Sequence, residues 1–270
     1  MKQIFLYGDL ADNFEAVSVL FIEAVEGPSA RIASLLAGGP DWEQYVPRYR
    51  APWKRLGAVE IVPIAPIGDD LKLDSSQIAQ LRRCSGLFIG GGDTRRYHEI
   101  YARAEVGGII RELYRSGVPY GGLSAGALIV GERCTIWGSK VTTPANEYSV
   151  CTSLYSDPAK DGDVQLRVGQ GLGLLQDCII EVHFSELGGF PRLVQAMELT
   201  GSTFGLGIDE PICLEIRDEV SVKVHGRGRA YFLRRTGPLR FEVRVLEPGD
   251  EFEPKWRNPG LSGPVWRGDR

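Results

Sequence analysis

The sequence predicts an α/β fold, with a mainly parallel sheet covered by helices on both faces and an antiparallel β extension at its C-terminal end. Apolar strand patterns alternate with helix patterns through most of the 270 residues, which is typical of parallel sheets. After Pro211 short strand patterns separated by turn residues follow one another directly. A composition of 43% hydrophobic and 24% charged residues is ordinary for a globular chain that buries a core.

The N-terminal half is expected to contain five strand–helix pairs. The strand patterns are short and apolar, and the helix patterns show amphipathic spacing, with Asp74 or Ser75 as a cap. Pro47 and Pro52 are expected to break one helix into pieces. The expected strands are Gln3–Tyr7, Ala30–Ala37, Ala58–Ile67, Leu87–Ile89 and a run that ends at Ser124. The expected helices are Phe14–Glu23, Trp42–Leu56, Asp74–Arg83, Tyr97–Ser116 and Ala125–Val130.

The C-terminal third changes character. A strand, a helix and a strand are expected at Ile179–His183, Phe190–Thr200 and Phe204–Ile208. A β-meander within residues 212–252 follows, with strands at Ile212–Arg217, Ser221–Val224, Ala230–Leu233 and Glu242–Leu246. Residues 253–270 form a tail rich in Pro, Gly and Arg. Without an internal repeat or a linker, residues 1–270 are expected to form one domain, whose meander and tail are candidate homodimer surfaces.

Composition argues against several classes of partner and compartment. The net charge of −4 supplies no basic field for nucleic acid or an anionic membrane. No apolar run reaches the roughly 20 residues of a membrane helix, and no signal peptide is evident. Five scattered cysteines without a C-x-x-C pair are expected to be reduced thiols. We therefore expect a cytoplasmic protein.

The motifs of cofactor and metal sites are also missing. The chain contains neither G-x-G-x-x-G nor G-x-x-x-x-G-K. Its three histidines are isolated, and no H-x-x-x-H or cysteine cluster accompanies them. The sequence therefore predicts neither a cofactor nor a metal ion.

Ser124 stands at the centre of the pentapeptide Gly122-Leu-Ser-Ala-Gly126, which has the form G-x-S-x-G. A buried strand pattern precedes it and a helix pattern follows. A serine in this position lies on a tight strand-to-helix turn, with its hydroxyl exposed at the carboxyl edge of the sheet. Ser124 is therefore the candidate nucleophile.

A serine nucleophile needs a base, and histidine is the obvious one. His98 and His225 are expected to have packing or surface roles, whereas His183 ends an apolar strand and emerges at the carboxyl edge, where catalytic groups gather. An acid must then orient His183. The acids nearby in sequence are Glu181, Glu186, Asp209 and Glu210, and the residues alone do not choose among them.

The glycine loop at residues 90–92 follows a strand and has two interpretations. Its flexible backbone can approach a ligand closely, so the amides of Gly91 or Gly92 could join that of Ala125 in an oxyanion hole. The alternative is a tight turn into a helix. Because Ser124 follows in the next strand along the chain, the oxyanion hole is the more economical interpretation.

The order of these motifs resembles the S51 serine peptidases, a family that contains peptidase E and cyanophycinase. The resemblance covers roughly residues 88–214 and is closer to cyanophycinase. It rests on Gly90-Gly-Gly-Asp93, Gly122-Leu-Ser-Ala-Gly-Ala127, Gly171-Leu-Gly-Leu-Leu175, Glu181-Val-His-Phe184 and Gly205-Leu-Gly-Ile-Asp-Glu210.

The resemblance implies a flavodoxin-like three-layer sandwich, similar to class I glutamine amidotransferases. It implies Ser124 as nucleophile and His183 as base, and it selects Glu210 as the acid. The chain order Ser, His, Glu differs from that of α/β-hydrolases, in which the acid precedes the histidine. The expected activity is hydrolysis of an amide bond in a small peptide or a peptide-like compound.

Substrate contacts are expected from Asp93, Thr94, Glu181 and Arg192. Cyanophycinases carry glutamine where this chain has Thr94, and Asp-Gln where it has Glu181-Val182. They also carry closely spaced arginines after the histidine, of which Arg192 remains. These departures remove groups that would hold a β-aspartyl-arginine unit, so cleavage of that unit is an alternative to the expected activity. They also leave a non-catalytic binding protein on the same fold as a second alternative.

Overall fold

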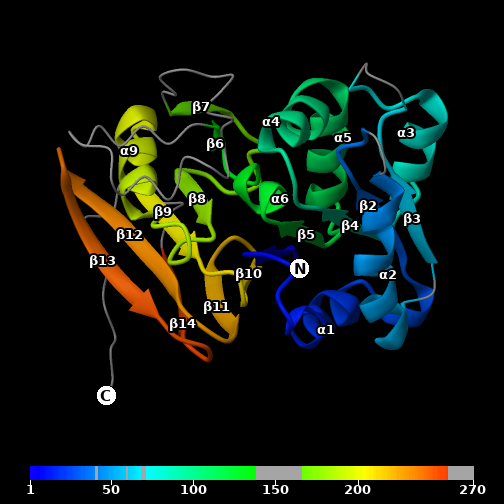
Figure 1. Ribbon diagram of the computed structural model, residues 1–270, viewed down its shortest axis with the longest axis horizontal. Coiled ribbons are helices and arrows are strands. Elements are labelled where there is room, and N and C mark those ends of the chain that lie inside the picture. The colour runs from blue at the N-terminus through cyan, green and yellow to red at the C-terminus, as the bar shows by residue number, and fades with distance from the viewer. Residues whose placement is uncertain (40–41, 59, 68–70, 138–165, 255–270) are drawn as a thin grey trace.

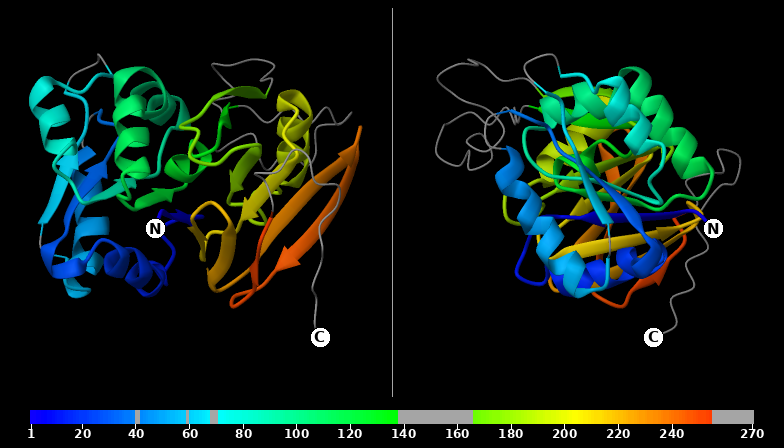
Figure 2. Two further views of the ribbon diagram at one scale, coloured as in Figure 1. Left: turned by 180° about the vertical axis from the view of Figure 1, so that it is seen from behind. Right: turned by 90° about the vertical axis from the view of Figure 1, so that its right-hand side faces the viewer.

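The computed structural model describes residues 1–39, 42–58, 60–67, 71–137 and 166–254. The tail expected at 253–270 lies outside the described residues except for its first two. The centre of the structure is an eight-stranded sheet with the order β14-β11-β10-β1-β5-β4-β2-β3. Helices cover both of its faces, so the three-layer α/β prediction is confirmed (Figures 1 and 2).

Five strands of the large sheet are parallel and three are antiparallel. The parallel strands are β1 (Gln3–Tyr7), β2 (Arg31–Leu35), β3 (Glu60–Ile64), β4 (Gly86–Ile89) and β5 (Tyr120–Leu123). The antiparallel strands are β10 (Ile212–Arg217), β11 (Ser221–Gly226) and β14 (Glu251–Phe252). Because β10 pairs with β1, the C-terminal strands extend the sheet on the side of β1.

Two hydrophobic cores lie on opposite faces of this sheet. Alternation along β1 sends Phe5 and Tyr7 toward α1 (Phe14–Ala24) and α2 (Val46–Arg55). Ile4 and Leu6 belong to the core on the other face. That face is covered by α3 (Ser75–Leu81), α4 (Thr94–Tyr97), α5 (Ala104–Arg115) and α6 (Ala125–Leu128).

A second sheet has four strands in the order β13-β12-β9-β8. Its strands β8 (Cys178–Val182) and β9 (Phe204–Ile208) are parallel, and β12 (Ala230–Gly237) and β13 (Arg240–Leu246) are antiparallel. Helix α9 (Phe190–Thr200) packs on it through a third apolar cluster. A separate pair joins β6 (Arg133–Trp137) to β7 (Arg167–Gln170), which the sequence patterns did not reveal.

The strands expected after Pro211 are present, but they do not form one continuous meander. Strands β10 and β11 pair with each other in the large sheet, whereas β12 and β13 pair in the small one. Gly226 at the end of β11 and Gly228 in the link to β12 both have positive φ values, of 111° and 109°. Glycine adopts positive φ values without strain, which allows the chain to turn here from the large sheet into the small one.

Two expected helices differ in detail. The helix expected at Tyr97–Ser116 is interrupted by a π-helical turn at His98–Ala102 and by Arg103, whose φ and ψ of −91° and 171° are extended. The helix expected at Trp42–Leu56 is divided at Tyr45, where a 3₁₀ turn (Trp42–Tyr45) meets α2. The expected break at the prolines is wrong, because Pro47 lies in the first turn of α2, where a proline is tolerated, and the helix continues through Pro52.

The cysteines that the structure describes are buried free thiols, namely Cys84, Cys134, Cys178 and Cys213. Burial raises the pKa of Cys84 to about 11, which keeps this thiol protonated at neutral pH. Cys151 lies outside the described residues. Across the described ranges, no helix combines the length and the apolar character that crossing a membrane requires.

Candidate active site

The ends of five parallel strands meet at one place. In the large sheet β1, β4 and β5 lead into Asp9, the glycine loop and Ser124, and in the small sheet β8 and β9 lead into His183 and Glu210. The two sheets meet where the chain passes from β9 to β10. There the amide of Gly8 donates to the carbonyl of Ile212 and the amide of Asp9 donates to that of Glu210, both at 3.1 Å.

Ser124 has the strained backbone of a strand-to-helix elbow, with φ 50° and ψ −108°. Its amide donates to the carbonyl of Tyr7 at 3.0 Å, which fixes the turn against β1. The elbow requires Gly126, because a Cβ there would lie 2.2 Å from the carbonyl oxygen of Ile89. The turn therefore packs directly against the backbone of β4.

We expect Gly126→Ala to lower the free energy of unfolding by about 3 kcal/mol or more, because the added methyl group overlaps the β4 backbone. Gly108→Ala in α5 is the matched control, since its Cβ would meet only the Arg111 guanidinium, at 3.9 Å. The control should gain about 1 kcal/mol through helix propensity. Urea denaturation of both variants measures the difference, and equal midpoints would contradict the packing argument.

Ser124, His183 and Glu210 form one hydrogen-bonded chain. Ser124 Oγ lies 3.0 Å from His183 Nε2, and His183 Nδ1 lies 2.8 Å from Glu210 Oε1. A carboxylate only accepts hydrogen bonds, so Nδ1 carries the imidazole proton. Nε2 of the neutral ring is then an acceptor, directed at the serine hydroxyl.

The other acids near His183 have different partners. Asp209 accepts hydrogen bonds from the amides of Ser185 and Arg229, at 3.0 and 3.1 Å. Glu186 accepts from the amide of Glu210 at 3.2 Å. Burial raises the pKa of Glu186, and the charges of Asp209 and Glu210 raise it further. Asp209 and Glu186 thus hold the backbone beside His183 and Glu210.

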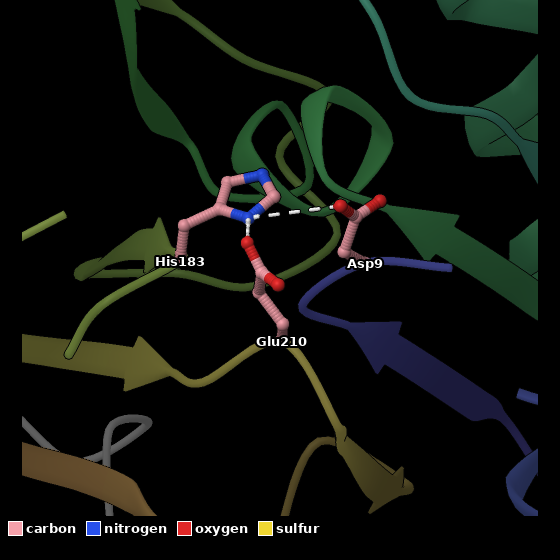
Figure 3. A group of neighbouring side chains, drawn as sticks. All are labelled: Asp9, His183 and Glu210. Carbon is pink, nitrogen blue, oxygen red and sulfur yellow. Dashed lines mark hydrogen bonds and ion pairs between the residues drawn. The ribbon is translucent and has the colours of Figure 1, made fainter. Parts of the chain in front are cut away.

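Asp9 is a second carboxylate beside His183. Its Oδ2 lies 3.9 Å from His183 Nδ1, beyond hydrogen-bond range (Figure 3). Its Oδ1 accepts from the amide of Leu10. Asp9, His183 and Glu210 present ligand atoms within 4.8 Å of one another, as a metal ion would need. An ion there would compete with Glu210 for His183 Nδ1.

The glycine loop lies directly against Ser124. A Cβ on Gly91 would be 3.1 Å from the Cβ of Ser124. The amide of Gly91 donates to the hydroxyl of Tyr49 at 3.3 Å, and burial raises the pKa of that phenol to about 12. Within the described part of the chain, the amides of Gly92 and Ala125 have no acceptor. Both N–H groups are therefore available to a ligand.

The expected substrate residues lie in two places. Asp93 caps α4 by accepting from the amide of Arg95 and also pairs with its guanidinium, and Thr94 is buried in the first turn. Glu181 and Arg192 form a buried ion pair, 1% and 3% exposed, with Oε1 2.5 Å from a guanidinium nitrogen. Their role in substrate contact stays a prediction.

We expect Arg192→Leu to lower the free energy of unfolding by about 3–5 kcal/mol, because it leaves Glu181 buried without its charge partner. Burial already raises the pKa of Glu181, whereas Arg192 lowers it. In the variant the buried Glu181 carboxyl keeps its proton in the folded state, whereas in the unfolded state it loses that proton above about pH 4.3. The free energy of unfolding of the variant therefore falls as pH rises. Urea midpoints at pH 5 and pH 8 measure this effect. The double variant Glu181→Gln/Arg192→Leu should lose the pH dependence, and a pH-independent Arg192→Leu would contradict the argument.

Sequence reasoning missed the contributions of Gly8, Asp9 and Tyr49. Gly8 and Asp9 follow an apolar strand, which is the same signal that indicated Ser124 and His183. A Cβ on Gly8 would lie 2.1 Å from the carbonyl oxygen of Asp209, so the close contact of β1 with the Glu210 segment depends on this glycine. Tyr49 had no such signal, because it lies within a helix distant in sequence.

Comparison with known proteins identifies related sequences. The model of peptidase family S51 matches residues 32–224. A cyanophycinase of Trichormus variabilis is 30% identical over 203 residues, which cover 74% of this chain and 59% of that relative. A cyanophycinase of Geminocystis herdmanii is 23% identical over 84% of this chain and 78% of its own length. The match thus spans less than two thirds of the Trichormus relative.

Solved structures with this fold include two peptidases. A peptidase from an acI-B1 Actinobacterium superposes with a TM-score of 0.64 over 94% of this chain and 97% of its own, at 17% identity. A putative peptidase E protein from Listeria monocytogenes has a TM-score of 0.55 over 84% of this chain and 100% of its own, at 19% identity. At these identities the likeness establishes the fold alone.

Proposed function

Because the chain belongs to peptidase family S51, we propose that it is a serine hydrolase that cleaves an amide bond in a small peptide or peptide-like substrate. The observation that carries the proposal is the chain of contacts from Ser124 Oγ through His183 to Glu210, at 3.0 and 2.8 Å. Nucleophile, base and orienting acid within hydrogen-bond reach are the requirement for activating a serine. No cofactor takes part in this proposal.

In the proposed reaction Ser124 Oγ attacks the scissile carbonyl carbon while its proton moves to His183 Nε2. The imidazolium keeps its Nδ1–H bond to Glu210, whose negative charge stabilises it. As the C–N bond breaks, His183 returns the proton to the leaving amine. Water then attacks the acyl-serine ester while His183 Nε2 takes its proton. The bond between the acyl carbon and Oγ breaks, and His183 returns the proton to Ser124 Oγ, which releases the acid and the free serine.

The negative oxygen of the tetrahedral intermediate needs hydrogen-bond donors. The amides of Ala125 and Gly92 support this role, since neither has an acceptor within the described residues. Ala125 follows Ser124 directly, and Gly92 follows Gly91, which lies against Ser124. Gly91 contributes by its close contact with Ser124 and by its bond to Tyr49, which together hold the loop.

For the substrate we propose contacts from Asp93 and Thr94. Glu181 and Arg192 were also expected to contact the substrate, but the full burial of their ion pair favours an indirect effect on the shape of the site. A second candidate substrate is the β-aspartyl-arginine unit, favoured by the relatives named cyanophycinase. A non-catalytic binding role is less well supported, because the serine and the histidine already lie within hydrogen-bond distance.

A panel of α-aspartyl dipeptides, β-aspartyl-arginine, other dipeptides and simple esters tests the proposal. Release of free amine from at least one amide, absent in Ser124→Ala, is the expected result. Turnover of esters without any amide would overturn the peptidase assignment. Binding of these compounds without turnover would favour the non-catalytic alternative.

A further inference from the structure

Strand β13 forms an outer edge of the small sheet. It pairs with β12 on one side, and no described strand pairs with its other side (Figures 1 and 2). Its seven residues therefore present a row of backbone N–H and C=O groups to the surroundings. Two of its side chains, Val243 and Val245, are 46% and 50% exposed.

The two faces of β13 differ in character. Alternation places Phe241, Val243 and Val245 on one face, and opposite them on β12 lie Arg235, Leu233 and Tyr231. Leu233, Tyr231 and Phe241 belong to the apolar cluster under α9. The other face of β13 carries Arg240, Glu242, Arg244 and the buried Leu246. The exposed valines thus continue an apolar surface that the molecule itself leaves partly uncovered.

Within the described residues, the centre of β13 has little of the usual protection of an edge strand. Natural edges are blunted by proline, charged side chains (lysine above all), bulges or a covering element. The charged side chains of β13 alternate in sign along one face, so they can pair with those of a second strand. Residues 240–246 contain neither proline nor lysine. The irregularity in the β12–β13 pairing lies at the hairpin end, between Arg235 and Gly237. An edge that is long, regular and partly apolar is suited to pairing with another strand.

We propose that β13 pairs in antiparallel fashion with β13 of a second copy of this chain, around a two-fold axis at Val243. An isologous contact of this type uses the same surface on both copies. The apolar faces of the two small sheets lie on the same side of the joined sheet only if odd-numbered residues of one β13 face odd-numbered residues of the other. The axis must then pass through a residue, and the candidates near the centre are 242, 243 and 244.

Charge decides among these three registers. An axis at Glu242 places the two glutamates opposite each other, and an axis at Arg244 does the same with the two arginines, both of which are unfavourable. An axis at Val243 places each Glu242 opposite Arg244 of the second copy. On the apolar face it pairs Val243 with Val243 and Phe241 with Val245. One register is therefore favoured on both faces.

The surroundings of β13 are compatible with this pairing. Helix α9 packs on β8 and β9 and reaches the β12–β13 hairpin near its turn, where Glu198 pairs with Arg235 and accepts from the amide of Leu239. Glu242 already forms an ion pair with Arg234 across the hairpin, at 2.7 Å. Arg244 lies 5.6 Å from the ring of Phe252. An arginine from the second copy would extend the Arg234–Glu242 pair into a network.

Sedimentation equilibrium tests the interface. The full chain should have twice the 29.7 kDa mass of one chain, and Val243→Lys should return it to the single-chain mass. Val220→Lys is the matched control, because Val220 is also 45% exposed but lies between β10 and β11. It should stay dimeric, and circular dichroism of both variants reports that they are folded. A wild-type protein of single-chain mass, or a dimer that survives Val243→Lys, would overturn the proposal.

Disulfide trapping tests the register. Facing residues of antiparallel strands have Cα atoms about 4.5–5.5 Å apart, within the range that a disulfide bridges. Val243→Cys should therefore form a covalent dimer on mild oxidation. Val245→Cys should not, since residue 245 faces 241 and lies about four residues away from 245 of the second copy. Equal trapping at both positions, or trapping at 245 alone, would contradict the register.

Discussion

Ser124→Ala is expected to lower kcat for amide hydrolysis by a factor on the order of 10⁶, because the variant has no atom that can form the acyl intermediate. Binding of the substrate should change little, since the remaining groups of the site stay in place. The measurement is kcat and KM on the best amide of the substrate panel. A purified variant that keeps a tenth of the wild-type kcat would exclude Ser124 as the nucleophile.

The loss in Ser124→Ala should not come from unfolding. The side chain of Ser124 does not cap α6, and its hydroxyl contacts His183 at 3.0 Å. The elbow backbone is held by other contacts, such as the bond of the Ser124 amide to Tyr7. The thermal midpoint of the variant should therefore match that of the wild type.

Glu210→Gln is expected to lower kcat by a factor on the order of 10⁴, which is the typical effect of neutralising the acid of such a triad. The amide of glutamine can present an N–H group to His183 Nδ1, and this favours the tautomer whose Nε2 cannot take the serine proton. The measurement is kcat at a pH where the wild-type rate is maximal.

Asp9→Asn is the matched control for Glu210→Gln, since it also neutralises one carboxylate beside His183. At 3.9 Å from Nδ1 the Asp9 carboxylate makes no hydrogen bond to the ring. Its neutralisation should reduce kcat by less than about tenfold, the size of a modest charge effect. A larger loss in Asp9→Asn than in Glu210→Gln would make Asp9 the orienting acid.

Two residues of the candidate site could be predicted from the sequence because one rule about the ends of strands applies to each strand separately. Parallel strands collect functional groups at their carboxyl ends, so Ser124 and His183 could be selected from the positions where apolar runs end. The fold class was also accessible from the sequence, because the alternation of strand and helix patterns can be read along the chain without knowledge of long-range contacts. Positions that depend on one strand and its following turn are therefore accessible from sequence.

Glu210 could not be separated from Glu181, Glu186 and Asp209 by the residues alone. Glu181 lies within a strand and the other three follow strands, and neighbouring residues can point in opposite directions. Which one reaches His183 depends on the crossing from β9 to β10, where the backbone of Asp9 binds that of Glu210. The resemblance to a family selected Glu210, whereas physical reasoning on one sequence lacked this long-range contact.

The division of the C-terminal strands between two sheets was equally inaccessible. The strand patterns at 221–224 and 230–233 follow each other closely, as neighbours in a meander do. They lie in different sheets because β11 pairs with β10 and β12 pairs with β9. The pairing of Glu181 with Arg192 likewise joins a strand to the following helix. Each of these features depends on which elements become neighbours in space.

The central claim is that Ser124 is a nucleophile activated by His183, and covalent labelling tests it most directly. The wild-type protein treated with a fluorophosphonate should gain one adduct, which peptide mass spectrometry should locate on Ser124. Ser124→Ala should gain none. An adduct on another residue, or equal labelling of the wild type and Ser124→Ala, would contradict the account.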